Sequence, residues 1–194
     1  MFIAIKITPG PVFLRIQESL KSILGNEKIN WVDLLNIHLT LAFLGDTEDE
    51  MIKVASIVLS RCCTRFESFR FSLRGTGVFR NFRDPRIVWI GIEKNAALAK
   101  LYDLINAGLK DAGFALEDRT FSPHITLGRI KSVRDASKLK ESLVKYKDAD
   151  IQDVIVKEVI LFESILKPSG PQYREIGKFR LSDPFPPQDS TDGQ

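Results

Sequence analysis

The two histidines of the chain stand in matching short motifs. His38 opens the sequence HLTL and His124 opens HITL, so each histidine is followed two residues later by a threonine. Side chains two apart in a β-strand point to the same face, so each motif would present an imidazole and a hydroxyl together. Imidazole gives or takes a proton near neutral pH, and a hydroxyl both donates and accepts hydrogen bonds. The pattern therefore indicates acid–base chemistry shared by two histidines.

A structural role is the main alternative for such a histidine. A single His-x-Thr on a strand is more often a satisfied structural histidine than a catalytic one. In this chain the pattern occurs twice and includes both histidines, so a catalytic role is favoured over a structural one. A zinc site is the competing functional interpretation, but zinc takes three or four ligands, and Cys, Asp and Glu at ligand spacing are missing beside the motifs. We therefore expect no metal and no cofactor.

The predicted elements occur twice in the same order. Periodicity and turn residues predict strand, helix, strand, helix, strand over residues 2–73 and again over 87–166, with a last strand at about 173–181. His38 and His124 are 86 residues apart, and the strands beginning at Phe2 and Ile87 are 85 apart. This period is longer than that of any solenoid, so it predicts two similar lobes. We expect one bilobal domain over 1–183, with intertwined halves at about 1–80 and 86–183, and a disordered tail at 184–194.

Local signals also predict where particular elements begin and end. Thr47 followed by Glu50 predicts a capping box at the start of the second helix. Asn95 is the expected N-cap of the third helix, and Gly113 is its expected end. The apolar segment at 154–166 is predicted to be a single strand.

The composition is that of a folded protein of ordinary size. The chain has 194 residues, 44% hydrophobic and 27% charged, which is enough for a core without a disulfide or metal staple. Its net charge of +3 does not by itself indicate a nucleic-acid partner. Cys62 and Cys63 are adjacent in a predicted helix and are interpreted as reduced core thiols. With no signal peptide and no apolar run of roughly 18 residues, a cytoplasmic location is expected.

Further segments add to the paired HxT motifs. They are Trp31, LAFLG at 41–45, GTGVF at 75–79 followed by PRIVWIGIE, FSPHITLGR at 121–129, and Ser164, Leu166, Gly170, Pro171 and Tyr173. With these segments the sequence resembles the two-histidine phosphoesterase superfamily, in its RNA 2′,3′-cyclic phosphodiesterase branch, which is also described as 2′-5′ RNA ligase-like. The resemblance covers nearly the whole chain.

The resemblance implies a pseudo-twofold, bilobal α+β fold with antiparallel sheets lining a central cleft and helices on the outside. It implies that His38 is the general acid that protonates the departing 3′ oxygen, and that His124 is the general base that activates water. Thr40, Thr126 and Arg129 would bind the phosphate, and the product would keep a 2′-phosphate. On the residues alone, the near symmetry leaves the two histidine roles interchangeable.

Arg129 follows the second motif at the position where the family carries a functional arginine, and a guanidinium suits phosphate recognition. Strict alternation along the strand, however, would put its side chain on the face opposite His124. Only a bend or a bulge at Gly128 would bring it into the cleft.

A basic and aromatic segment lies between the two halves. Its residues are Arg74, Arg80, Arg83 and Arg86, interleaved with Phe79 and Phe82. Arginine can follow RNA phosphates and an exposed phenylalanine can stack on a base. A solvated loop whose phenylalanines anchor in the core explains the same pattern equally well.

The sequence therefore favours hydrolysis of an RNA 2′,3′-cyclic phosphate end to a 2′-phosphomonoester, without a metal. The expected partner is RNA with such an end, transfer-RNA fragments being one candidate, and we expect a monomer with no membrane and no obligatory protein partner. The alternatives are a 2′-5′ RNA ligase or a 2′-5′ oligonucleotide phosphodiesterase that uses the same histidines. A non-catalytic RNA-binding module is disfavoured because both histidines and both threonines are present.

Overall fold

The computed structural model describes residues 1–117, 120–168 and 170–183, so the tail predicted at 184–194 lies outside the described residues. Four α-helices and nine strands form within these ranges. In chain order they are β1 (Phe2–Lys6), α1 (Pro11–Ile23), β2 (Lys28–Trp31), β3 (His38–Phe43), α2 (Asp49–Cys63), β4 (Phe69–Phe79), β5 (Ile87–Ile92), α3 (Ala96–Asp111), β6 (His124–Ser132), α4 (Ala136–Val144), β7 (Asp150–Val156), β8 (Glu158–Lys167) and β9 (Gly170–Arg180).

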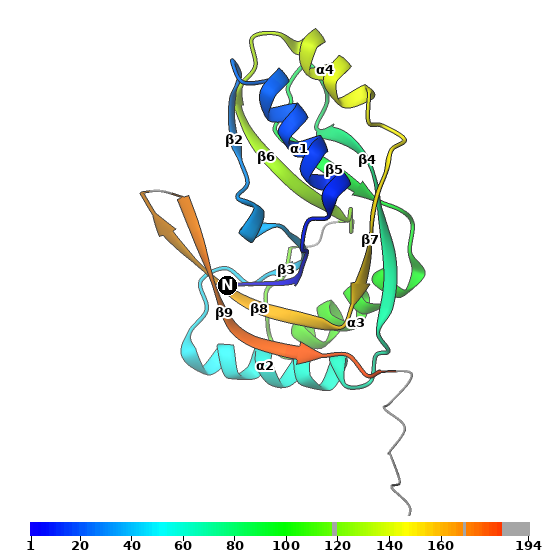
Figure 1. Ribbon diagram of the computed structural model, residues 1–194. Coiled ribbons are helices and arrows are strands. Elements are labelled where there is room, and N and C mark those ends of the chain that lie inside the picture. Colours follow the sequence, from blue (N-terminus) through cyan, green and yellow to red (C-terminus); the bar gives the residue numbers. More distant parts are fainter. Residues whose placement is uncertain (118–119, 169, 184–194) are drawn as a thin grey trace, which may run out of the picture.

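The strands form two antiparallel sheets, which confirms the α+β prediction. One sheet has the order β3-β1-β8-β9 and the other has the order β2-β6-β5-β4-β7. The four-stranded sheet takes two strands from each end of the chain, and the five-stranded sheet takes β2 and β4 from the first half. Figure 1 shows that β7 leads from one sheet into β8 of the other. Each sheet is therefore built from both halves of the chain.

The helices cover the sheet faces that do not carry the histidines. α2 packs on α3, β8 and β9, whereas α1 and α4 pack on each other and on β7 and β4; the two pairs lie at the bottom and top of Figure 1. On the motif strands, Leu39 and Leu41 of β3 and Ile125 and Leu127 of β6 are at most 2% exposed and belong to the core under the helices. The predicted division into an apolar face and a histidine face is thus confirmed.

The start of α2 differs from the sequence prediction. Thr47 and Glu50 form no capping box, because the helix begins directly after Glu48 and no side chain caps it. The Thr47 hydroxyl lies 3.2 Å from the carbonyl oxygen of Gly45, which accepts its hydrogen bond. Glu50 instead pairs with Lys53 at 2.7 Å. The capping prediction was wrong because both polar groups find closer partners.

The segment predicted as one strand from Val154 to Leu166 is two strands. β7 ends at Val156, β8 begins at Glu158, and only Lys157 lies between them. The two strands belong to different sheets. Both are apolar on the face that packs on the core, so hydrophobicity alone does not reveal the point at which the chain crosses from one sheet to the other.

The side chain of Asn95 caps the N-terminus of α3. The Asn95 side chain accepts a hydrogen bond from the amide of Leu98 at 2.9 Å and donates to the carbonyl of Arg70 at 2.8 Å. We predict that Asn95→Ala lowers the free energy of unfolding by about 1–2 kcal/mol. Glu48→Ala, at a cap without a side-chain bond, should change it by less than about 0.5 kcal/mol. Urea denaturation measures both, and equal losses would contradict the assignment of the caps.

Candidate active site

Each histidine is held by the chain just before its own motif. Nδ1 of His38 lies 2.6 Å from the carbonyl oxygen of Asn36, and Nδ1 of His124 lies 2.8 Å from that of Ser122. A carbonyl oxygen only accepts a hydrogen bond, so Nδ1 carries a hydrogen in both rings. Nε2 is left to take or give a proton in each ring. Equivalent contacts therefore hold both imidazoles in the same tautomer, with the hydrogen on Nδ1.

The threonines of the two motifs are available for a ligand. Thr40 and Thr126 lie two residues beyond the histidines on β3 and β6, on the same faces. Both are partly buried. Within the described parts of the chain, neither hydroxyl forms a side-chain hydrogen bond. We call the face of each sheet that carries the histidine and threonine of its motif the site face.

A bulge brings Arg129 onto the site face. Trp89 and Ile87 of β5 pair with Thr126 and Arg129 of β6. The β5 residues are two apart while their partners are three apart, so β6 holds one extra residue, Leu127. Residues paired across antiparallel strands share a face. Arg129 therefore lies on the same face as Thr126, where strict alternation would have excluded it.

The site faces of the two sheets meet around Arg129. Burial lowers the pKa of His38 and of His124 and raises that of Tyr173, and the positive charge of Arg129 acts on all three groups in the lowering direction. His38 and Tyr173 belong to the four-stranded sheet, whereas His124 and Arg129 belong to the other. β3 and β6 are also in contact. The structure therefore brings together both motifs and Arg129, the five residues that the sequence singled out.

Aromatic residues that the sequence did not assign to the site surround both histidines. The His38 ring lies 5.0 Å from Phe2 and 5.3 Å from Tyr173, edge-on to the latter. The His124 ring lies 4.5 Å from Phe79, also edge to face. Phe2 and Tyr173 come from opposite ends of the chain, so only the fold reveals their position. These rings exclude water from one side of each imidazole.

Burial lowers the pKa of both histidines below the ordinary value of 6.5. Desolvation of the charged ring is the largest cause, and the hydrogen bonds to Asn36 and Ser122 oppose it. Arg129 lowers both values further, and the charge of His124 also lowers the pKa of His38. Without an anionic ligand, the site therefore favours two neutral imidazoles.

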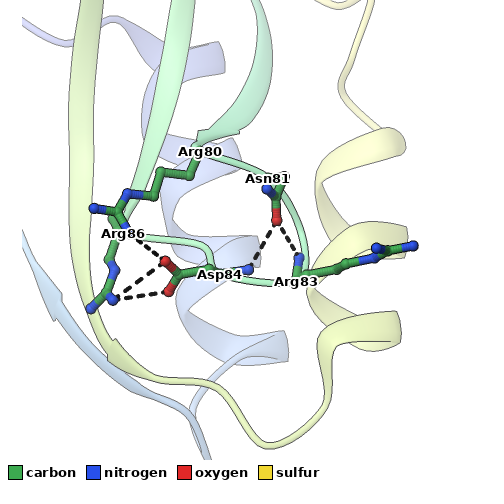
Figure 2. Close-up of polar contacts among 5 residues, drawn as sticks. All are labelled: Arg80, Asn81, Arg83, Asp84 and Arg86. Carbon is green, nitrogen blue, oxygen red and sulfur yellow. Dashed lines mark hydrogen bonds and ion pairs between the residues drawn. The ribbon is translucent and has the colours of Figure 1, made fainter.

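Residues 80–86 of the basic and aromatic segment form the loop between β4 and β5 (Figure 2). Asp84 binds Arg80 and Arg86, and the Asn81 side chain accepts hydrogen bonds from the amides of Arg83 and Asp84 at 2.8 and 3.0 Å. Two of its three arginines are thus paired within the loop.

Phe79 and Phe82, the two phenylalanines of the basic and aromatic segment, have structural contacts. Phe82 packs against the core, as the solvated-loop interpretation expects. Phe79 contacts Trp89 and His124 and so belongs to the site.

The described residues contain neither a metal-binding cluster nor a membrane-spanning helix. Among residues 1–117, 120–168 and 170–183, no group of three or more His, Cys, Asp or Glu side chains is placed to hold a metal ion. No helix in these ranges is long and apolar enough to cross a membrane.

The lowered histidine pKa values predict a pH dependence. Between the folded-state pKa and 6.5, the unfolded chain binds more protons than the folded chain, so the free energy of unfolding rises with pH. The stability contribution should be complete above 6.5 and should be lost as pH falls through the folded-state pKa values. Because the chain has only two histidines, NMR titration of the folded and urea-unfolded chain resolves both. Folded midpoints at or above the unfolded ones would contradict the burial of these rings.

Arg129→Gln should raise the pKa of both histidines, because it removes a positive charge near each ring. The same NMR titration measures this shift without any substrate. Arg74→Gln is the matched control, since the Arg74 guanidinium lies on β4 paired with Glu93 at 2.9 Å. If the midpoints stay fixed in Arg129→Gln, or move equally in Arg74→Gln, Arg129 does not lie between the motifs.

The chain is similar in sequence to one protein family and to relatives that share one name. The profile of the 2′-5′ RNA ligase superfamily matches residues 11–164. A protein of Methanothermobacter thermautotrophicus named RNA 2′,3′-cyclic phosphodiesterase is 35% identical, over 86% of this chain and 89% of its own. One of the same name from Archaeoglobus fulgidus is 31% identical, over 92% of this chain and 98% of its own.

Solved structures share the fold. A Thermus thermophilus protein has a TM-score of 0.78 at 27% identity and covers 95% of this chain and 98% of its own. Escherichia coli LigT complexed with 3′-AMP has a TM-score of 0.70 at 25% identity and covers 93% of this chain and 97% of its own. Profile, relatives and structures agree over most of the chain, which belongs to the 2′-5′ RNA ligase superfamily.

Proposed function

We propose that this protein hydrolyses the 2′,3′-cyclic phosphate at an RNA end to a 2′-phosphomonoester, with no metal ion. The observation that carries the proposal is the pair of imidazoles whose Nδ1 atoms are held by carbonyl oxygens at 2.6 and 2.8 Å, which leaves both Nε2 atoms for proton transfer. The name shared by relatives at 31–35% identity supports the substrate class. The catalytic unit is the bilobal domain at 1–183.

Opening the ring requires one proton to be removed and one to be supplied. In the proposed step His124 Nε2 takes a proton from water as the water oxygen bonds to phosphorus. The bond from phosphorus to the 3′ oxygen breaks, and His38 Nε2 gives that oxygen a proton. His124 ends protonated and His38 neutral, and exchange with solvent restores both. Each proton transfer contributes roughly 10² to 10⁴ in rate.

The remaining site residues hold the phosphate. The hydroxyls of Thr40 and Thr126 have no other side-chain partner among the described residues and can donate to the two non-bridging oxygens. The Arg129 guanidinium adds a charge-assisted contact. A bound phosphate anion also offsets the charge of Arg129 and raises the pKa of His38, because an opposite charge nearby favours the protonated ring. The acid form of His38 is thus favoured when substrate is present.

The family profile favours a second candidate reaction at the same site, the joining or cleavage of 2′-5′ linkages. The same two proton transfers serve it when a ribose hydroxyl replaces water. Hydrolysis comes first in our proposal because water needs no second binding site, and because the relatives carry the phosphodiesterase name.

Hydrolysis of a short oligonucleotide with a 2′,3′-cyclic phosphate end, in excess chelator, tests the proposal. We expect conversion to a 2′-phosphate, and a loss of roughly 10² or more in kcat for His38→Ala and for His124→Ala. Chromatography against synthetic 2′- and 3′-phosphate standards identifies the product.

Asn95→Ala is a control for this experiment, because Asn95 caps α3 and its side chain bonds the Leu98 amide and the Arg70 carbonyl, neither of which belongs to a motif. It should destabilise the fold but keep the turnover of the folded protein. An inactive wild type, activity abolished by the chelator, or a 3′-phosphate product would each refute the proposal as stated.

A further inference from the structure

A row of charged side chains runs from His38 across the site face of the four-stranded sheet. Lys6 of β1 pairs with His38 of β3, and Glu158 of β8 pairs with Arg180 of β9. Ala4 pairs with Ile160 in the antiparallel pair β1–β8, and continuing that register by two residues places Lys6 opposite Glu158. Paired residues share a face, so the row is His38, Lys6, Glu158 and Arg180.

A cavity of about 620 Å³ lies along this row, beside the catalytic pair and not between its members. Lys6, Lys157, Glu158 and Arg180 are among the residues that line it, and neither histidine does. Its volume is within the range of small-molecule sites, roughly 300–1,000 Å³. Its lining residues come from the ends of β1, β7 and β9, from the start of β8 and from the segments beside them. Figure 1 shows the passage of the chain from β7 into β8 between the two sheets.

Two cations of this cavity form no ion pair within the described ranges, although the carboxylates of Glu158 and Asp183 also line it. Lys6 is bound to Glu175 at 2.9 Å. Lys157 and Arg180, in contrast, form no side-chain hydrogen bond or ion pair with any described residue. Both are exposed. An ammonium and a guanidinium that share a cavity and lack partners suit a phosphate group.

The proposed reaction places the rest of an RNA strand on this side of the site. Water and the leaving 3′ oxygen lie on opposite sides of phosphorus in an in-line displacement. If His38 protonates the 3′ oxygen, the terminal ribose lies toward the four-stranded sheet. The 5′ side of that ribose, which bears the next phosphate, then extends along the sheet that carries Lys6 and Arg180.

We propose, on the basis of the proposed function, that the cavity binds the nucleotide that precedes the cyclic-phosphate end, with Arg180 and Lys157 contacting its phosphate. The cavity is then a subsite that distinguishes an RNA strand from a cyclic mononucleotide. A mononucleotide fills the histidine site alone, whereas an oligonucleotide also reaches the two cations of the cavity.

The test compares two substrates, uridine 2′,3′-cyclic phosphate and a short oligouridylate with the same end. Arg180→Glu and Lys157→Glu should each lower kcat/KM for the oligonucleotide about tenfold or more, mainly through KM, and at least ten times as much as for the mononucleotide. The salt dependence of KM for the oligonucleotide should weaken by about 0.7 in logarithmic slope for each phosphate that the variant no longer binds. Arg15→Glu is the charge-matched control, because Arg15 is exposed on α1 and does not line the cavity.

Equal losses on both substrates, or no loss on the oligonucleotide, would overturn the subsite. If the wild type hydrolyses neither substrate, the proposed function fails, and direct binding then decides the inference. Fluorescence anisotropy with an oligouridylate ending in a 2′-phosphate should show weaker binding for Arg180→Glu than for Arg15→Glu. Equal affinities of these two variants would overturn it.

Discussion

Each motif strand contains one extra residue, a β-bulge, and this bulge determines which of the later side chains lie on the site face. Leu127 interrupts the alternation of β6 and turns Arg129 onto the face of His124 and Thr126. β3 has the same irregularity at Leu41, because Ile3 and Ala4 of β1 pair with Ala42 and Thr40. Both bulges lie three residues after the histidine of their motif, so they are a repeated feature of the fold.

The repeated backbone carries different side chains at the position that each bulge exposes. The residue five places after His124 is Arg129, and the residue five places after His38 is Phe43, which is 62% exposed. The pseudo-twofold site therefore has a guanidinium at this position only on the strand of His124. This difference breaks the symmetry that leaves the two histidine roles interchangeable in the sequence. Under the proposed function, this asymmetry gives the bound phosphate one orientation between the two rings.

Local sequence signals were sufficient for the elements that position the histidines. Apolar periodicity predicted β3, β6 and the helices, and Asn95 was recognised as a cap because its partner is three residues away. β2 was missed because it is a strand of four residues at the edge of its sheet, with no fully buried side chain. The crossing at Lys157 was missed because β7 and β8 are both apolar toward the core.

The features that the sequence could not reveal depend on pairing between distant strands. The bulges are visible only in the register against β1 and β5. Phe2 and Tyr173 reach His38 from the two ends of the chain, and the cavity beside it is assembled from separate segments of the chain. Long-range register of this kind has no local signature, so these features required the structure.

The central claim is that His38 gives the proton and His124 takes it, and a change of leaving group tests this most directly. In a cyclic substrate with sulfur in place of the 3′ oxygen, the leaving thiolate needs no proton, since a thiol has a pKa of about 8.5. The measurement is the rate of opening of this substrate by His38→Ala and His124→Ala. We predict that the sulfur substitution restores most of the activity of His38→Ala and none of that of His124→Ala. Rescue of His124→Ala alone, or of both variants equally, would contradict the assignment.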